Sequence, residues 1–237
     1  MVPSYIPAWR YGGPIHSVHG LCRALAARGH RVDVATTNVD GDGDSDVALG
    51  TAVDVDGVNV HYFPSRRLRR IYYSPPLRRF LAERIAGSWE IVHTHSVFLW
   101  PTAAAAQLAR RAGKPYVLSP RGMLVPDLIA RRSSVAKRAW IAAFERRNVE
   151  CAAAVHVTSA AEAEALRGAG FRPREILDLP NGVDAPDAIA SADSPPGSNL
   201  QSGLPARYAL FLGRISWKKG LDRLVDCLLY TSDAADE

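Results

Sequence analysis

A basic segment near the end of the chain carries the residues best suited to chemistry on an anion: Arg214-Ile215-Ser216-Trp217-Lys218-Lys219-Gly220. It follows an apolar run at 208–212 that predicts a strand, so Arg214 lies at the strand's carboxyl end, where open α/β sheets bind ligands. Arginine can bind phosphate oxygens through two hydrogen bonds, and Lys219 precedes a predicted helix that begins near Gly220. The segment therefore suits a diphosphate. From these residues alone, a solvated basic loop explains it equally well.

Two adjacent glycines, Gly12 and Gly13, lie between a first strand at Val2-Pro3 and a predicted helix. Glycines at this place let backbone N–H groups approach an anionic or sugar ligand, and the helix N-terminus adds a partial positive charge. The pair does not belong to a GxGxxG dinucleotide fingerprint. By itself it favours a plain turn over a ligand-binding loop.

Polar residues also lie at the carboxyl ends of two further predicted strands. His93 and His95 flank Thr94, so both side chains point to the same face of a buried strand. A metal site would need further ligands, and none is suggested nearby; we expect one histidine to be structural and the other to line a cleft. Arg121, followed by Gly122, ends the next strand and could present its guanidinium to an acceptor or a phosphate. An ordinary surface arginine is the alternative.

Other clusters predict no metal or disulfide. The acidic run 40–46 does not match an EF-hand, because Ser45 stands where glycine is needed and Thr51 where glutamate is needed. We expect a solvated loop there. The three cysteines, at positions 22, 151 and 227, have no CxxC spacing and no even framework, which excludes a zinc site and a disulfide scaffold of the usual kinds.

Composition predicts an ordinary globular protein. Hydrophobic residues make up 47% of the 237 and charged residues 22%, the net charge is +5 and the pI is near 9.3. No apolar run approaches the roughly 20 residues that span a bilayer, and the start of the chain is unlike a signal peptide, so we expect a cytoplasmic protein.

The densest basic patch consists of Arg66, Arg67, Arg69 and Arg70, with Tyr72 and Tyr73 following. Cations mixed with aromatic side chains suit peripheral contact with the anionic inner face of a membrane. A solvated face is the simpler interpretation. No motif for nucleic-acid binding is present.

Strand-like and helical runs alternate along most of the chain, which predicts an α/β fold: a parallel, Rossmann-like sheet with helices on both faces. Asp56-Gly57 between two alternating runs predicts a tight hairpin. The predicted helices cover 15–26, 76–85, 102–112, 135–150 and 160–169. The predicted strands cover 31–36, 53–55, 58–63, 90–95, 116–119, 154–158 and 176–179.

Composition also suggests the domain organisation. We expect a first Rossmann-like domain over 1–184, a Pro- and Gly-rich linker over 185–206, and the start of a second Rossmann-like domain over 207–226. The last residues, 227–237, do not continue the apolar stripe of the preceding helix and look like translated sequencing-adapter read-through. At the other end, we expect residues to be missing upstream of the short first strand.

Six motifs, in this order, resemble those of family 4 glycosyltransferases, which have the two-domain GT-B fold. Each motif is modest alone, but together they extend from residue 3 to residue 220 and make a specific match. They are Pro3-Ser4-Tyr5 through Gly12-Gly13-Pro14, Ile91-Val92-His93-Thr94-His95, Ser119-Pro120-Arg121-Gly122-Met123-Leu124, Thr158-Ser159 with Glu162 and Glu164, Pro180-Asn181-Gly182-Val183-Asp184, and Leu212-Gly213-Arg214 through Lys219-Gly220.

The resemblance implies roles for the donor side. Arg214 and Lys219 match the catalytic pair that holds the donor's diphosphate and stabilises it as a leaving group, since their charges neutralise the charge that develops as the glycosidic bond breaks. Gly12 and Gly13 match the loop that closes over the donor phosphates. The resemblance also implies retention of the sugar's anomeric configuration and no metal or other cofactor.

On the acceptor side, the resemblance implies that His95 and Arg121 line the cleft, although many relatives carry histidine in place of Arg121. A pair of glutamates that binds the donor sugar and ribose in the family's second domain would lie beyond residue 237. As given, the chain is therefore expected to be inactive.

For the full-length protein, the resemblance implies transfer of a hexose from a nucleotide-diphosphate sugar to a saccharide or lipid-linked acceptor during synthesis of surface polysaccharide. Two alternatives remain at this point. A nucleotide-sugar epimerase would keep the fold and differ in its product. A non-catalytic binding module would lack the acidic pair in its complete sequence.

Overall fold

The computed structural model describes residues 1–130, 134–183, 210–211 and 219–233. The chain forms two units, Met1–Asp184 and Ala185–Glu237, which are considered separately here. Most of the sequence expectations fall in the first unit. Arg214 lies outside the described residues.

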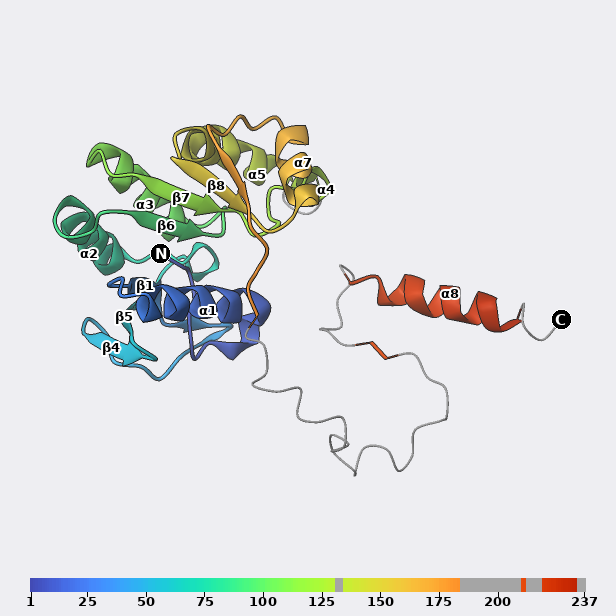
Figure 1. The fold of residues 1–237 in the computed structure, drawn as a ribbon, viewed down its shortest axis with the longest axis horizontal. Coiled ribbons are helices and arrows are strands. Elements are labelled where there is room, and N and C mark those ends of the chain that lie inside the picture. Colours follow the sequence, from blue (N-terminus) through green and yellow to red (C-terminus); the bar gives the residue numbers. More distant parts are fainter. Residues whose placement is uncertain (131–133, 184–209, 212–218, 234–237) are drawn as a thin grey trace, which may run out of the picture. The chain divides into compact units, whose positions relative to one another are not determined.

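Two groups of strands make up the first unit (Figure 1). In one group, β1 pairs in parallel with β5, and β5 pairs antiparallel with β4. In the other group, the strands are all parallel and follow the order β6-β7-β8-β9. Their bounds are β1 (Asp33–Thr37), β4 (Ala52–Val55), β5 (Val58–Phe63), β6 (Val92–His95), β7 (Tyr116–Ser119), β8 (Ala154–Val157) and β9 (Ile176–Asp178).

The first residues of the chain connect these two groups. The amino nitrogen of Met1 donates to the His93 carbonyl at 2.7 Å, and the His95 amide donates to the Met1 carbonyl at 3.0 Å. On the other side, the Val2 amide donates to the Ala35 carbonyl at 3.3 Å. The N-terminus accordingly lies between β6 and β1 (Figure 1). Residues 1–4 thus act as a central parallel strand, as the Val2-Pro3 run predicted.

The resulting strand order is β4, β5, β1, residues 1–4, β6, β7, β8 and β9. The chain starts in the middle, winds outward through β1 and β5, then returns to β6 and winds outward on the other side. The direction of winding therefore reverses between residues 1–4 and β6. In open α/β sheets, such a switch point is where ligands bind, at the carboxyl ends of the strands. The predicted Rossmann-like α/β fold is confirmed.

Helices follow the strands, as the sequence pattern predicted. α2 (Pro75–Ala86) begins after Ser74, whose hydroxyl accepts from the Leu77 amide, and it buries Leu77, Leu81 and Ile85. This stripe packs on α3 (Trp100–Arg111), which offers a run of small buried alanines. The other helices of the first unit are α1 (Gly13–Ala27), α4 (Pro126–Ala130), α5 (Ser134–Trp140), α6 (Arg146–Glu150) and α7 (Ala160–Gly168), with short 3-10 turns η1 (Trp9–Tyr11) and η2 (Arg69–Ile71).

The helix predicted over 135–150 is not regular. Between α5 and α6, the residues Ile141–Glu145 (η3) form a π-helical turn. Such turns are uncommon and frequently mark functional sites. This one places the side chain of Glu145 in the interior, where 1% of the residue is exposed. The sequence gives no sign of the irregularity, because the partners of Glu145 come partly from another element.

The acidic run 40–46 is also more ordered than predicted. Two short strands, β2 (Val39–Asp40) and β3 (Gly43–Asp44), form an antiparallel ribbon in place of a plain loop. Arg69 stabilises it, because one guanidinium nitrogen donates to the Asp44 carboxylate at 2.6 Å and the other donates to the Gly43 carbonyl at 2.6 Å. Within the described residues, no group of three histidine, cysteine or acidic side chains could hold a metal ion.

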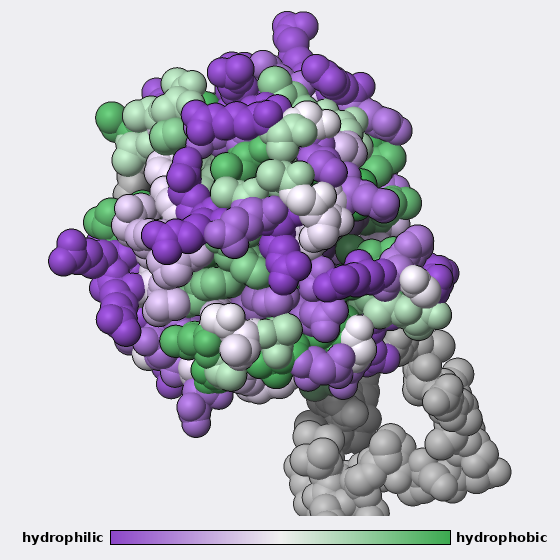
Figure 2. Space-filling view, turned by 90° about the vertical axis from the view of Figure 1, so that its left-hand side faces the viewer, coloured by the Kyte–Doolittle hydropathy of each residue, from purple (hydrophilic) through white to green (hydrophobic). Residues whose placement is uncertain are grey.

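The second unit is described only in part. Its helix α8 (Leu221–Asp233) begins after Gly220, close to the predicted start. It extends to Asp233, into the segment 227–237 that we expected to be read-through. Among the described helices, none is long and apolar enough to cross a membrane. Figure 2 shows the face on the side of α2 and β4 in the first unit, where hydrophobic residues form small groups separated by hydrophilic ones.

Candidate functional site

Strained turns follow β6, which borders the switch point, and its neighbour β7. After β6, Ser96 and Phe98 have φ values of 73° and 63°, and after β7, Arg121 has a φ of 57°. A positive φ is uncommon for residues other than glycine, and each such residue costs about 1–3 kcal/mol and persists only where the surroundings hold it. Backbone strain of this kind clusters at active sites and ligand clamps. These turns therefore mark the carboxyl edge of the sheet as the candidate site.

The turn after β6 is held by Glu145. Its carboxylate accepts from the Phe98 amide at 2.9 Å and from the Trp140 indole nitrogen at 2.8 Å on one oxygen, and from the Asn148 amide at 3.2 Å on the other. Burial raises the pKa of Glu145 above its usual range, although the hydrogen bonds that it accepts act in the opposite direction. The π-helical turn thus supplies the acceptor that the strained backbone at Phe98 needs.

The turn after β7 is held in the same way by Glu162 of α7. One carboxylate oxygen accepts from the Gly122 amide at 2.5 Å. The other accepts from the Thr158 amide at 2.9 Å and from the Thr158 hydroxyl at 3.0 Å. The carboxylate therefore joins the end of β7 to the end of β8 and fixes the backbone next to Arg121.

Arg121 is half-buried and held by neutral groups. One terminal guanidinium nitrogen donates to the Asn181 side-chain oxygen at 2.6 Å, and the other donates to Nδ1 of His95 at 3.2 Å. The Nε atom is buried and has no hydrogen-bond partner among the described residues. Burial lowers the pKa of Arg121, and the charge of Glu162 partly opposes that shift. The structure thus brings together His95 and Arg121, the two residues expected on the acceptor side.

A row of buried polar side chains lies beneath this pair, across β6, β7 and β8. Nε2 of His93 is 2.8 Å from the Ser119 hydroxyl, which is 3.0 Å from Nδ1 of His156. Nε2 of His156 lies 2.9 Å from the Leu179 carbonyl. Because a carbonyl can only accept, His156 donates from Nε2 and accepts at Nδ1 from the Ser119 hydroxyl. Ser119 then accepts from Nε2 of His93. For a His156 ring with one N–H group, the donor and the acceptor of all three hydrogen bonds are thus assigned.

The partners also fix the protonation of His95. A guanidinium can only donate, so Nδ1 of His95 accepts from Arg121 and its proton is on Nε2. The rings of His93 and His95 lie with centroids 4.1 Å apart. Burial lowers the pKa of His93 to about 3, and burial together with the neighbouring His93 lowers that of His95 well below its usual value. Both histidines are therefore neutral at pH 7. His93 belongs to the hydrogen-bonded row with Ser119 and His156, whereas His95 is bonded to Arg121. The expectation that one histidine is structural and the other lines a cleft stays a prediction.

The glycine pair forms the start of α1 at the same edge of the sheet, with Gly12 as the N-cap and Gly13 as the first helical residue. Gly12 has φ 66° and ψ −138°, a conformation that is essentially restricted to glycine. A Cβ atom on Gly13 would meet nothing within 4 Å. Beside the pair, the Trp9 ring stacks on His16 with centroids 5.2 Å apart. The backbone thus requires glycine at position 12, whereas position 13 is open enough for a ligand or another residue.

The predicted diphosphate pair belongs to the second unit. Lys219 is exposed and directly precedes Gly220 and α8. Arg214 lies outside the described residues. The role assigned to the two cations stays a prediction.

The sequence analysis assigned no role to the side chains that hold the site, namely Glu145, Glu162 and Asn181, although Glu162 and Asn181 are part of the motifs that carry the family resemblance. One signal existed for Glu162, because Ser159-Ala160-Ala161-Glu162 is a capping-box pattern at the start of α7. The Ser159 hydroxyl does accept from the Glu162 amide, at 3.3 Å. The carboxylate, however, binds Thr158 and Gly122. Its long-range partner could not be read from local spacing.

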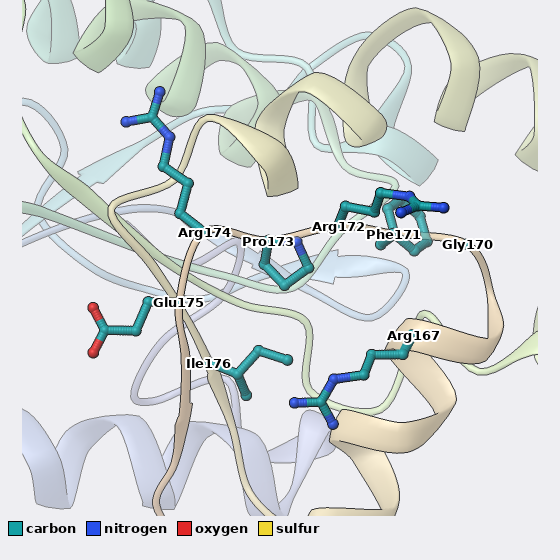
Figure 3. Close-up of a pocket in the computed structure, with 8 residues that line it drawn as sticks. All are labelled: Arg167, Gly170, Phe171, Arg172, Pro173, Arg174, Glu175 and Ile176. Carbon is teal, nitrogen blue, oxygen red and sulfur yellow. The ribbon is translucent and has the colours of Figure 1, made fainter.

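Two surface hollows lie at the opposite, amino edge of the strands. The larger, of 510 Å³, lies between the end of α7 and the start of β9 and is lined partly by Arg167, Arg172 and Arg174. The guanidinium groups of these arginines point in different directions (Figure 3). They do not converge on one position, as binding a single anion requires. The candidate site is therefore the carboxyl edge of the sheet and not this hollow.

Comparisons with known proteins identify the family and the fold of the chain. A family profile described as a glycosyl transferase 4-like domain matches residues 12–182. Among solved structures, sucrose-phosphate synthase from Thermosynechococcus elongatus is similar, with a TM-score of 0.56 and 18% identity over 77% of this chain and 48% of that one. The chain thus spans about half the length of that enzyme, and the likeness shows a shared fold. A second structure of the enzyme gives a TM-score of 0.48 and 18% identity over 78% and 91% of the two chains. A search of curated protein sequences gives no match.

Proposed function

Because the chain belongs to the family of glycosyl transferase 4-like domains, we propose that its full-length protein transfers a hexose from a nucleotide-diphosphate sugar to a saccharide or lipid-linked acceptor. We assign the transfer to the synthesis of cell-surface polysaccharide, with retention of the anomeric configuration. The proposal draws on the family match and on the cluster at the switch point of the sheet, where an α/β fold binds its ligands.

One observation carries the assignment of the first unit to the acceptor side. His95 and Arg121 follow neighbouring strands and are joined by a hydrogen bond of 3.2 Å, and their turns are held in strained conformations. Rigid donors at fixed positions can orient a sugar hydroxyl for attack on the donor, and correct orientation contributes much of the rate enhancement in group transfer. The backbone at Gly12 and Gly13 can approach the donor from the other side of the switch point.

In this proposal the leaving group is stabilised by cations of the second unit. Arg214 and Lys219 neutralise the charge that develops on the diphosphate as the bond to the sugar breaks, which makes them the catalytic pair. The reaction then needs no metal ion or other cofactor.

We place the protein in the cytoplasm, with peripheral contact at the inner face of the membrane through the patch Arg66, Arg67, Arg69 and Arg70. Arg69 contributes less than the others, because its guanidinium binds Asp44 and Gly43. The remaining arginines of the patch suit anionic head groups.

The test is transfer or hydrolysis of a nucleotide sugar by the full-length protein. Single variants Arg214→Ala and Lys219→Ala are expected to lower kcat by about 100-fold or more, the usual effect of removing a group that stabilises transition-state charge. Arg172→Ala, an exposed arginine at the amino edge of the sheet, is the control and should keep full activity. Wild-type activity in both test variants would refute the diphosphate role.

A further inference from the structure

The positive charge of Arg121 has no counter-ion in contact with it in the part of the chain that the structure describes. Within the described residues, no carboxylate lies within 4 Å of its guanidinium. Its two hydrogen-bond partners are the side-chain oxygen of Asn181 and the neutral ring of His95. The nearest acidic residue that acts on it, Glu162, has both oxygens engaged by donors of Gly122 and Thr158.

This arrangement leaves part of the binding capacity of the guanidinium unused. Each terminal nitrogen uses one of its two N–H groups, so one N–H on each remains for a ligand. The Nε–H group is buried and has no partner among the described residues, although buried polar groups are almost always hydrogen-bonded. Buried charges are normally paired, because removing a charge from water is unfavourable. The φ of 57° adds backbone strain at the same residue. A charge that is half-buried, strained and unpaired in the free protein is expected to have a partner in the complex.

We propose that Arg121 determines acceptor specificity by binding an oxyanion, a carboxylate or a phosphate group, on the acceptor saccharide. The planar guanidinium matches both groups, which it can bind through two parallel hydrogen bonds. The term acceptor rests on the proposed function, since it presumes that the first unit holds the saccharide to be extended.

The neighbouring groups make this charge the dominant one on the acceptor side. His93 and His95 are neutral at pH 7, because burial depresses the pKa of each ring. His95 donates from Nε2 and can bind either a hydroxyl or an oxyanion, so it does not discriminate between them. Asn181 and Glu162 are positioning residues, which hold the side chain and the backbone of Arg121 in place before the ligand arrives.

The experiment measures binding and does not use transfer. The isotope-labelled 237-residue chain is titrated at low salt with methyl glucuronide, with methyl glucoside, which lacks only the carboxylate, and with UDP as a probe of the donor's diphosphate. Amide chemical shifts of Gly122 and His95 give the dissociation constants. The variants are Arg121→Gln, Arg121→Lys and, as the matched control, Arg172→Gln at the amino edge of the sheet.

Methyl glucuronide should bind about 10- to 100-fold more tightly than methyl glucoside, the range expected for a hydrogen-bonded charge pair. Arg121→Gln should abolish that preference and leave binding of the glucoside unchanged, Arg121→Lys should retain part of it, and Arg172→Gln all of it. If Arg121→Gln does not fold, the comparison of the two glycosides on the wild-type chain decides.

Equal binding of the two glycosides, or a preference that persists in folded Arg121→Gln, would overturn the proposal. So would binding of UDP that depends on Arg121 without any preference for the glucuronide, because the anion would then belong to the donor. The activity of the variants Arg214→Ala and Lys219→Ala is a separate test. Wild-type activity in both would refute the proposed role of these residues at the donor's diphosphate and would leave the glucuronide preference intact.

Discussion

Glu162 offers a direct test of how the candidate site is held in place. The change Glu162→Gln keeps the shape of the side chain but replaces one carboxylate oxygen by an NH₂ group, which cannot accept a hydrogen bond. The carboxylate accepts from three donors, on Gly122 and Thr158, with one oxygen facing each residue. The side-chain oxygen of the new glutamine can accept from Thr158. Its NH₂ group then faces the backbone N–H of Gly122, so that two donors meet and no hydrogen bond forms.

The expected loss is that of one hydrogen bond to a charged acceptor, about 1.5–3 kcal/mol. Relaxation of the strained backbone at Arg121 can return part of it, since a positive φ stores about 1–3 kcal/mol. We therefore expect the free energy of unfolding to fall by about 1–3 kcal/mol. The Gly122 amide, which loses its acceptor, should exchange with solvent faster than in the wild-type chain.

The matched control is Glu164→Gln, an exposed carboxylate two residues further along α7. It carries the same change in charge and chemistry without the contact to Gly122. Urea unfolding followed by circular dichroism gives the free energies, and hydrogen exchange followed by NMR gives the protection of the Gly122 amide. If Glu162→Gln is as stable as Glu164→Gln and Gly122 keeps its protection, the carboxylate does not hold the turn and the reasoning fails.

Two further expectations concern the same edge of the sheet. Gly12→Ala should lower the midpoint of thermal unfolding, because alanine is strained at φ 66°. Gly13→Ala should leave the midpoint nearly unchanged, because a Cβ atom there meets no atom within 4 Å. Equal midpoints for the two variants would contradict the conclusion that the backbone requires glycine at position 12. The folded-state pKa of His93, near 3, lies below the unfolded value of about 6.5. The unfolded chain therefore binds more protons, and the contribution of His93 to stability is present above pH 6.5 and lost as the pH falls toward 3, at about 1.4 kcal/mol per pH unit. Urea unfolding at several pH values should show a shallower dependence in His93→Asn, and an unchanged slope would count against a neutral buried ring.

The hydrogen bonds at the ends of β6, β7 and β8 explain why these positions carry residues of these types. Ser119 is the acceptor for His93 and the donor to His156, a double role that a hydroxyl can fill within one small side chain. Glu145 accepts from the Phe98 amide with one oxygen, and Glu162 accepts from the Gly122 and Thr158 amides with its two oxygens. The site is rigid because acceptors on helices meet donors on the turns.

The amino-acid sequence by itself determined the local structure of the first unit. Alternating apolar residues set the strands and the helical stripes set the helices, because both depend on spacing within a few residues. Asp56-Gly57 specified the turn between β4 and β5, where both residues have positive φ, at 54° and 78°. The order of strands and helices, and with it the α/β class and the family resemblance, follows from the same local patterns.

Only the tertiary structure decided how the candidate site is built. Glu162 meets Gly122 across 40 residues and Glu145 meets Phe98 across 47, distances at which sequence spacing carries no information about contact. The neutral state of His95 depends in the same way on burial and on the donor-only guanidinium of Arg121. Burial and the polarity of a hydrogen bond are properties of a folded environment, so they exist only once strands far apart in the chain lie side by side.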